Sequence, residues 1–188
     1  LRAALGNTPA GRYLESVSRA LHGDGEGSQQ LLRESAATFP DSDLLGFAQL
    51  QADFPAIARG PLSMEQQAVL ARLPPSAQAT VRGIFLLSQN RLSELAALDE
   101  VLAQAQWTDL WYMDANQLRA EWRSRVTNAE LRRRLGDEAL AMLDSASLHQ
   151  PSLGLYAARV RAAITAQRPD VLLESVAVLA QWTGSVAR

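Results

Sequence analysis

The chain contains no cysteine and no lysine, so all eighteen basic side chains among its 188 residues are arginines. Without a thiol there can be no disulfide, no thiolate metal site and no cysteine nucleophile. The lack of cysteine is compatible with an oxidising compartment such as the bacterial periplasm or cell envelope. Arginine-only usage beside abundant Ala and Leu is typical of a GC-rich bacterial genome. The compartment stays unknown at this stage.

Long apolar runs and an excess of positive charge are also missing. No stretch approaches the roughly 20 apolar residues of a membrane-spanning helix, and no charged segment followed by an apolar one opens the chain. A net charge of -2 gives no electrostatic basis for binding nucleic acid. Because the chain begins with Leu1 instead of Met, we expect it to be a fragment of a longer bacterial protein.

Catalytic and metal-binding motifs are scarce. No H-E-x-x-H, G-x-S-x-G or phosphate-loop sequence occurs, and the glycine-rich run 23–27 lacks the lysine of a phosphate loop. This run therefore predicts a turn between helices. His22 and His149 stand at the ends of predicted helices, where imidazole interacts favourably with the helix dipole. We predict structural roles for both histidines, no bound metal or cofactor, and no enzymatic activity.

Helical periodicity is the main positive signal. Thr8-Pro9 predicts a capped helix start, and Tyr13, Val17 and Leu21 follow at helical spacing. Ser63-x-x-Gln66 is a capping box, and Pro74-Pro75 interrupts the pattern. No alternating strand pattern of useful length occurs. The sequence predicts an all-α fold of about ten helices in five antiparallel hairpins, at 9–22, 28–39, 42–54, 63–73, 77–88, 92–104, 107–126, 128–147, 152–167 and 169–183.

Two near-matching strings indicate how these helices pack: Ser28-x3-Leu32-x2-Ser35-x4-Pro40 and Ala139-x3-Leu143-x2-Ala146-x4-Pro151. Offsets of four and three keep the small and large residues on one helical stripe, and small residues let a second helix approach closely. Both strings resemble the second helix of the tetratricopeptide (TPR) repeat. The resemblance implies a single TPR-like domain over residues 1–188, with the hairpins stacked into a right-handed superhelix.

A weak internal sequence similarity favours the same architecture. Residues 86–104 and 163–181 align without gaps at an offset of 77 residues, or about two repeats. Shared positions include Leu95 with Leu172 and Val101 with Val178. Chance agreement between Ala- and Leu-rich helices is the alternative explanation.

The segment 107–126, predicted to be the longest helix, carries the candidate partner-binding residues. Its tryptophans and one leucine form a stripe that is typical of a core: Trp107, Trp111, Leu118 and Trp122. A second row lies beside this stripe: Tyr112, Asn116, Arg119 and Arg123. TPR-like stacks bind partners along a concave face lined by first helices, and this is the first helix of the fourth hairpin. We therefore predict that the second row contacts a peptide by stacking and hydrogen bonding.

A basic triplet offers a less specific signal. Residues 132–134 are all arginine, and consecutive helical residues point about 100° apart, so they cannot form one tight patch. A solvated face paired with Glu130 and Asp137 is the favoured interpretation, and docking of an acidic peptide or a lipid headgroup is the alternative.

Together these patterns predict a non-catalytic scaffold that binds a protein or peptide partner within a larger bacterial assembly. The main alternative is an accessory helical domain that is fused to an enzyme or membrane protein and contacts its own chain. A third hypothesis is a helical enzyme with a ligand cavity near the tryptophans.

Overall fold

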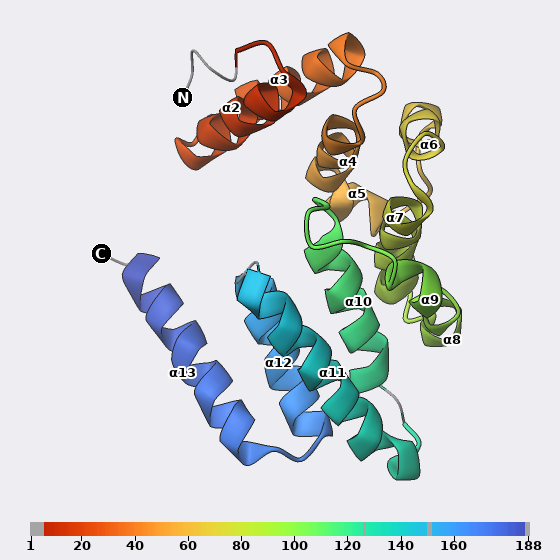
Figure 1. Cartoon of the computed structure of the whole chain (residues 1–188), viewed down its shortest axis with the longest axis vertical. Helices are drawn as coiled ribbons and strands as arrows, with labels where there is room; N and C mark the ends of the chain where they lie inside the picture. The colour runs from red at the N-terminus through yellow and green to blue at the C-terminus, as the bar shows by residue number, and fades with distance from the viewer. Residues whose placement is uncertain (1–5, 126, 150–151, 187–188) are drawn as a thin grey trace.

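The computed structural model describes residues 6–125, 127–149 and 152–186. Within these ranges the chain forms twelve α-helices and no β-strand, which confirms the predicted all-α class (Figure 1). The helices are α2 (Pro9–Leu21), α3 (Gly25–Thr38), α4 (Asp43–Ala52), α5 (Phe54–Ile57), α6 (Met64–Leu70), α7 (Pro75–Ser88), α8 (Leu92–Ala96), α9 (Asp99–Leu102), α10 (Tyr112–Ser124), α11 (Ala129–His149), α12 (Leu153–Thr165) and α13 (Pro169–Val186).

The predicted start signals at Thr8 and Ser63 are confirmed, and Ser42 caps α4 in the same way. The Thr8 hydroxyl accepts the Gly11 N–H at the start of α2, and Ser42 accepts the Leu45 N–H at the start of α4. At α6, the side chains and backbone N–H groups of Ser63 and Gln66 pair reciprocally as a capping box. Each of these bonds joins residues three apart, so the sequence alone suffices to predict it.

Two predicted helices differ from the observed ones. The segment 92–104 is split into α8 and α9, because a bond from the Leu98 N–H to the Leu95 carbonyl tightens the chain between them. The segment 107–126 becomes helical only at Tyr112, and α11 with 21 residues is the longest helix. The Asp109 carboxylate accepts the Gln106 N–H at 2.7 Å and holds the preceding residues in a turn. The predicted end of that helix at Val126 lies outside the described residues.

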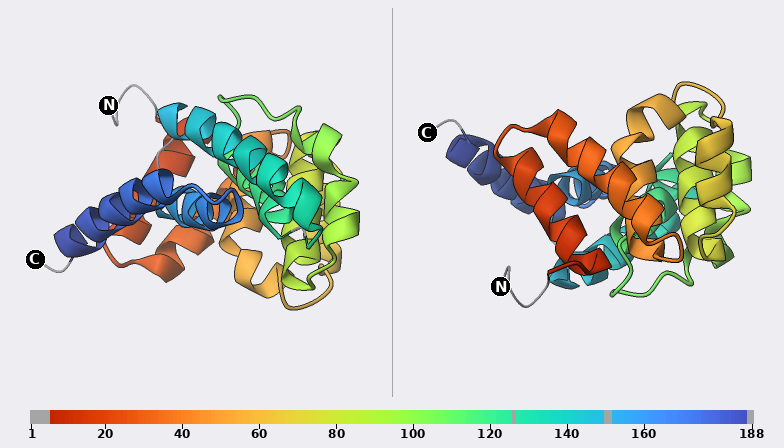
Figure 2. Two further views of the ribbon diagram at one scale, coloured as in Figure 1. Left: turned by 90° about the horizontal axis from the view of Figure 1, so that it is seen from below. Right: turned by 90° about the horizontal axis from the view of Figure 1, so that it is seen from above.

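The helices pack as five successive pairs: α2 with α3, α4 with α6, α7 with α8 and α9, α10 with α11, and α12 with α13. Neighbouring pairs also touch, through α3 and α4, α7 and α10, α9 and α10, and α11 and α12, while α5 contacts both α4 and α7 and so links the second pair to the third. Figure 1 shows this order as an arc that runs from α2 past α6 to α9 and returns to α13. Both views of Figure 2 keep α6–α9 on the side opposite to α13.

Three of the pairs are joined by the same turn. In each, a residue with positive φ separates two helices by a three-residue connection: Gly23 at 85°, Asn90 at 55° and Gln167 at 57°. The following N–H group bonds the carbonyl five residues back, as in a Schellman motif, at 2.9–3.0 Å. Asn90 and Gln167 are 77 residues apart, which is the offset between the similar segments 86–104 and 163–181, so these segments contain equivalent turns.

The repeated stripes are buried as predicted. Leu32 is 7% exposed and Leu143 is fully buried, and the small residues beside them, Ser28, Ser35, Ala139 and Ala146, are also buried. Pro151, which ends the second string, lies outside the described residues. Ala139, Leu143 and Ala146 belong to a cluster formed with α12 residues such as Leu155 and Ala158. Small side chains therefore allow close contact between helices of successive pairs.

Candidate functional site

A groove lies between α10, α11 and the segment 103–111 that connects α9 to α10. Its volume is about 550 Å³, which is within the usual range for ligand pockets. The lining combines small apolar residues with aromatic and polar ones: Ala103, Ala105, Gln106, Trp107, Tyr112, Asn116, Arg119, Ala141, Met142, Ser145 and His149. It therefore brings together three segments that are well separated along the chain.

An aromatic cluster forms one end of the groove. The Trp107 side chain is 59% exposed and its ring stacks on that of His149, with centroids 5.7 Å apart and planes 22° from parallel. Tyr112 meets the same imidazole edge-on at 6.3 Å. A large aromatic surface left open beside polar groups is a feature of protein-binding sites.

The predicted tryptophan stripe is wrong for Trp107, which precedes α10 and points into the groove region instead of the core. The rest of the stripe is placed as expected. Trp111 is buried, packs on Phe47 and donates its indole N–H to Ser76 at 3.0 Å. Leu118 is buried and Trp122 is half-buried.

The predicted partner-binding row is divided by the structure. Tyr112 and Arg119 are half-buried and line the groove, as does Asn116, although Asn116 is only 7% exposed. Arg123 is equally buried and does not line the groove. The expected exposure is therefore wrong for Asn116 and Arg123. The row also faces α9 and α11, the second helices of two pairs, instead of a face made of first helices.

Arg123 is held in place by an ion-pair network around Asp99 of α9. Its two Nη atoms donate to the Asp99 carboxylate at 2.5 and 2.8 Å, and Trp122 Nε1 donates to the same carboxylate at 3.0 Å. Burial by itself would raise the pKa of Asp99. The hydrogen bonds from Arg123 and Trp122 and the charges of Arg123 and Arg119 lower that pKa to about 2. This network fixes α9 against α10, so we assign Arg123 a structural role.

Arg119 keeps most of its hydrogen-bonding capacity for the groove. Its Nε donates weakly to Asp99 at 3.3 Å, and its two Nη atoms bond to none of the described residues. Asn116 donates its Nδ2 to the Tyr112 carbonyl at 2.9 Å, while its Oδ1 accepts no bond from the described part of the chain. The groove therefore presents both donors and an acceptor.

The charge of the groove contrasts with that of the whole chain. Its lining includes Arg119 and His149 but neither Asp nor Glu, although the chain has a net charge of -2. Sequence reasoning missed Trp107, Met142, Ser145 and His149 as groove residues. Thr108 and Asp109, residue types that favour turns, could have indicated that Trp107 lies before the helix, since Asp109 holds the turn that precedes α10.

The basic triplet on α11 is exposed, as expected for a solvated face. Arg134 pairs with Glu138 at 3.6 Å, and Arg132 donates to the Thr127 carbonyl. The expected pairing with Asp137 is wrong, since Asp137 lies 4.0 Å from Arg168 at the start of α13. The side chain of Glu130 is outside the described residues.

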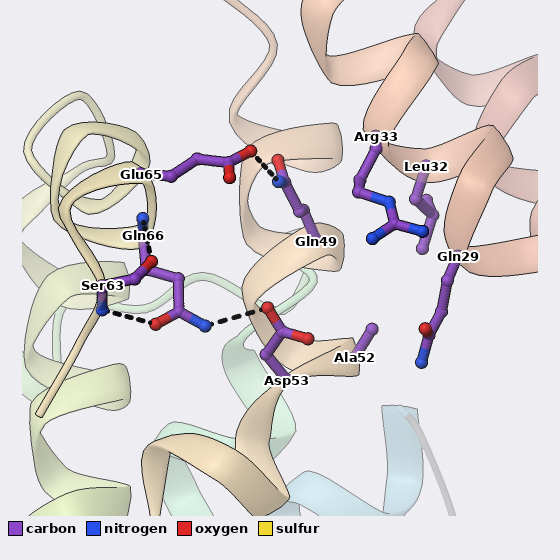
Figure 3. Close-up of a pocket in the computed structure, with 9 residues that line it drawn as sticks. All are labelled: Gln29, Leu32, Arg33, Gln49, Ala52, Asp53, Ser63, Glu65 and Gln66. Carbon is purple, nitrogen blue, oxygen red and sulfur yellow. Dashed lines mark hydrogen bonds between the residues drawn. The ribbon is translucent and has the colours of Figure 1, made fainter. Parts of the chain in front are cut away.

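A second hollow lies between α3, α4 and the start of α6 (Figure 3). Its polar side chains largely bond one another: Gln66 bonds Ser63 and Asp53, and Gln49 donates to Glu65 at 3.4 Å. Figure 3 shows Arg33 facing these groups from α3. Because carboxylates line this hollow and its polar side chains on α4 and α6 largely pair with one another, it offers an anionic ligand less than the groove beside α10 does.

Other predicted features have ordinary surroundings. His22 caps the end of α2, with Nδ1 2.7 Å from the Ser18 carbonyl oxygen. Of the run 23–27, only Gly23 and Asp24 lie in the turn, because α3 begins at Gly25 and Asp24 caps it by accepting the Gly27 N–H. In the described part of the chain, no three His, Asp or Glu side chains are grouped as metal ligands. None of its helices has the length and apolar character to cross a membrane.

Comparisons of the chain with protein-family models, curated proteins and solved structures found no match.

Proposed function

We propose that this chain is a non-catalytic, TPR-like scaffold that binds a protein or peptide partner within a larger bacterial assembly. The observation that carries the proposal is the groove beside α10, where Trp107, Tyr112 and Arg119 meet on a surface made by the pair α10–α11 and the connection that precedes it. Trp, Tyr and Arg are the residue types that dominate binding energy at protein interfaces.

The helical arrangement supports the TPR-like part of the proposal. Five pairs follow one another along the chain, and three of them share a turn residue with positive φ and the same connection length. The buried stripes of α3 and α11 have the small–large–small pattern that resembles the second TPR helix. We infer that the pairs form a right-handed superhelix, as in that family.

The chemistry of the groove supports binding instead of catalysis. Its ionisable side chains are Tyr112, Arg119 and His149, no carboxylate is among its lining residues, and no hydrogen bond joins Ser145 to His149 in the described part of the chain. A general base or an activated nucleophile needs such a partner within hydrogen-bonding distance. Exposed aromatic surface and unused hydrogen-bond donors instead suit a peptide, because its side chains can pack on the rings and its oxygen atoms can accept from the donors.

A selection from a random heptapeptide display library tests this function. We expect the chain to enrich specific sequences, and we expect the double variant Trp107→Ala/Arg119→Gln to lose them while melting like the parent. Arg133→Gln, which removes an exposed arginine of α11 outside the groove, is the matched control and should retain them. Enrichment that is equal for the parent and the groove variant would refute the assignment of this site.

Exposed leucines favour the alternative, an accessory domain that contacts its own longer chain. Leu21 of α2 is 81% exposed and Leu173 of α13 is 72% exposed, on the first and last of the described helices. Exposed apolar side chains near the ends of a helical stack are typical of surfaces that another element covers. Cross-linking within the full-length protein from positions 21 and 173 would distinguish this alternative.

A further inference from the structure

We propose that the groove beside α10 recognises a peptide segment in which a carboxylate binds Arg119 and an adjacent large apolar or aromatic side chain packs on Trp107. This inference rests on the proposed function, since it names the class of peptide that the same site takes. Three independent features of the groove lead to it.

The first feature is an arginine whose charge is not fully neutralised. Asp99 is the acidic residue that pairs with Arg119, at 3.3 Å, but both of its oxygens are already bound by the buried Arg123. Glu138 lies on the other side of Arg123, at 3.5 Å, and also pairs with Arg134. Three arginines thus share two carboxylates, and Arg119, with both Nη atoms unbonded in the described chain, is the one that lines the groove.

The second feature is the composition of the lining. A carboxylate in the groove would pair with Arg119 and repel an acidic ligand, and none is present. The hollow between α3 and α6 has the opposite character, because Asp53 and Glu65 line it together with Arg33. Electrostatic complementarity of this kind selects an anionic ligand at the groove beside α10.

The third feature is the geometry around the arginine. The planar guanidinium binds a carboxylate through two parallel N–H groups, and the two free Nη atoms of Arg119 can supply them. Asn116 Oδ1, in a side chain that is 7% exposed, can accept a backbone N–H from the same peptide. The exposed ring of Trp107, stacked on His149, provides the neighbouring apolar surface.

A peptide fits these features better than a nucleic acid does. Nucleic-acid binding relies on several cations that follow the phosphate backbone. Here a single arginine with unused donors faces a groove of about 550 Å³, a volume that suits one or two side chains.

The test uses labelled heptapeptide pools, amidated at the C-terminus and randomised except for a central Phe-Asp, Phe-Asn or Ala-Asp pair. Binding to the folded chain is measured by fluorescence anisotropy. Hydrogen bonds to charged groups contribute about 1.5–3 kcal/mol, so the Phe-Asp pool should bind at least about tenfold more tightly than the Phe-Asn pool. Replacing Phe by Ala should weaken binding by a similar factor.

Variants of the chain test which residue reads the carboxylate. In Arg119→Gln the preference for Phe-Asp over Phe-Asn should fall below about twofold, as a double-mutant cycle requires for a direct contact. Ser145→Glu, at an exposed groove position on α11, leaves Arg119 unmutated and should remove the same preference, because it adds a carboxylate to the groove. Ser18→Glu on α2 and Arg133→Gln on α11 are the matched controls and should keep it.

A fourth pool with a free C-terminal Phe and no acidic side chain identifies the source of the carboxylate. If the parent binds this fourth pool and Arg119→Gln does not, the inference is supported and the C-terminal carboxylate of the peptide is the group that Arg119 binds. Equal binding of the Phe-Asp and Phe-Asn pools to the parent, or a preference that survives in Arg119→Gln, would overturn it. If display selection yields groove binders without a carboxylate, only the ligand class is wrong. If no peptide binds, the scaffold function fails as well.

Discussion

Replacing Asp99 by Asn should destabilise the chain by about 2–3 kcal/mol at pH 7. Asp99 is the centre of the network that joins α9 to α10, and its carboxylate accepts bonds from Arg123, Arg119 and Trp122. Asn keeps the shape of the side chain but removes its charge. The Arg123 side chain, 9% exposed, would then lose its bidentate anionic partner and retain the Arg119 carbonyl at 2.9 Å and Glu138 at 3.5 Å.

The magnitude follows from the pKa of Asp99. Its fall from 3.8 to about 2 corresponds to about 2 kcal/mol of preference for the charged form in the folded state. The Asp99 side chain is 20% exposed, so solvent screening limits this contribution, while the buried guanidinium of Arg123, left without its bidentate carboxylate, adds to the cost. We therefore expect a loss well above that of an average surface substitution, which is within about 0.5 kcal/mol.

The pH dependence has a definite sign. Because folding lowers the pKa of Asp99, the stabilisation is complete above pH 3.8 and is lost as the pH falls towards 2. Urea unfolding followed by circular dichroism should therefore show a large difference between parent and Asp99→Asn at pH 7 and a smaller one at pH 2. Asp41→Asn, at an exposed position outside the network, is the control. A cost equal to that of Asp41→Asn, or one independent of pH, would refute the assigned role.

Three further predictions concern stability. Burial raises the pKa of Asp114 to about 6, although a hydrogen bond from Gln51 lowers it, so the contribution of Asp114 to stability should fall as the pH rises from 3.8 to 6. In urea unfolding, Asp114→Asn should therefore stabilise the chain at pH 7 by about 1–2 kcal/mol. The same dependence of stability on pH in the parent and in Asp114→Asn would argue against this. Gly136→Ala places a Cβ atom 2.6 Å from the Ala166 backbone nitrogen, so we expect the free energy of unfolding to fall by about 1–3 kcal/mol and the melting temperature to fall with it. Parent-like melting would contradict the close approach of α11 and α12. Leu143→Ala should cost about 2–5 kcal/mol because the side chain is fully buried, and thermal unfolding that shows a loss below 1 kcal/mol would exclude a core position.

The sequence was sufficient for features that depend on neighbouring residues along the chain. Thr8, Ser42 and Ser63 cap helices through bonds to residues three positions ahead, so their roles follow from spacing alone. The burial of Leu32 and Leu143 also follows from periodicity, because a helical stripe of small and large apolar residues is stable only against another helix.

Only the tertiary structure distinguished Arg119 from Arg123. The two residues lie four positions apart on one face of α10, so the sequence predicts equal exposure for both. Asp99 of α9 lies against this face, and both of its carboxylate oxygens accept hydrogen bonds from Arg123. Arg119 makes only one long hydrogen bond to Asp99, and it lines the groove. The difference is set by a carboxylate 20 residues from Arg119 and 24 from Arg123, which no periodicity within α10 can reveal.

The groove itself depends on the same kind of long-range contact. Trp107 precedes α10 and His149 ends α11, yet their rings stack because α10 and α11 pack side by side. The sequence determined that these segments are helical and which of their stripes are buried, through interactions within one or two turns. The tertiary structure decided which polar and aromatic side chains meet, because helices that pack together bring distant residues into contact at positions set by both partners.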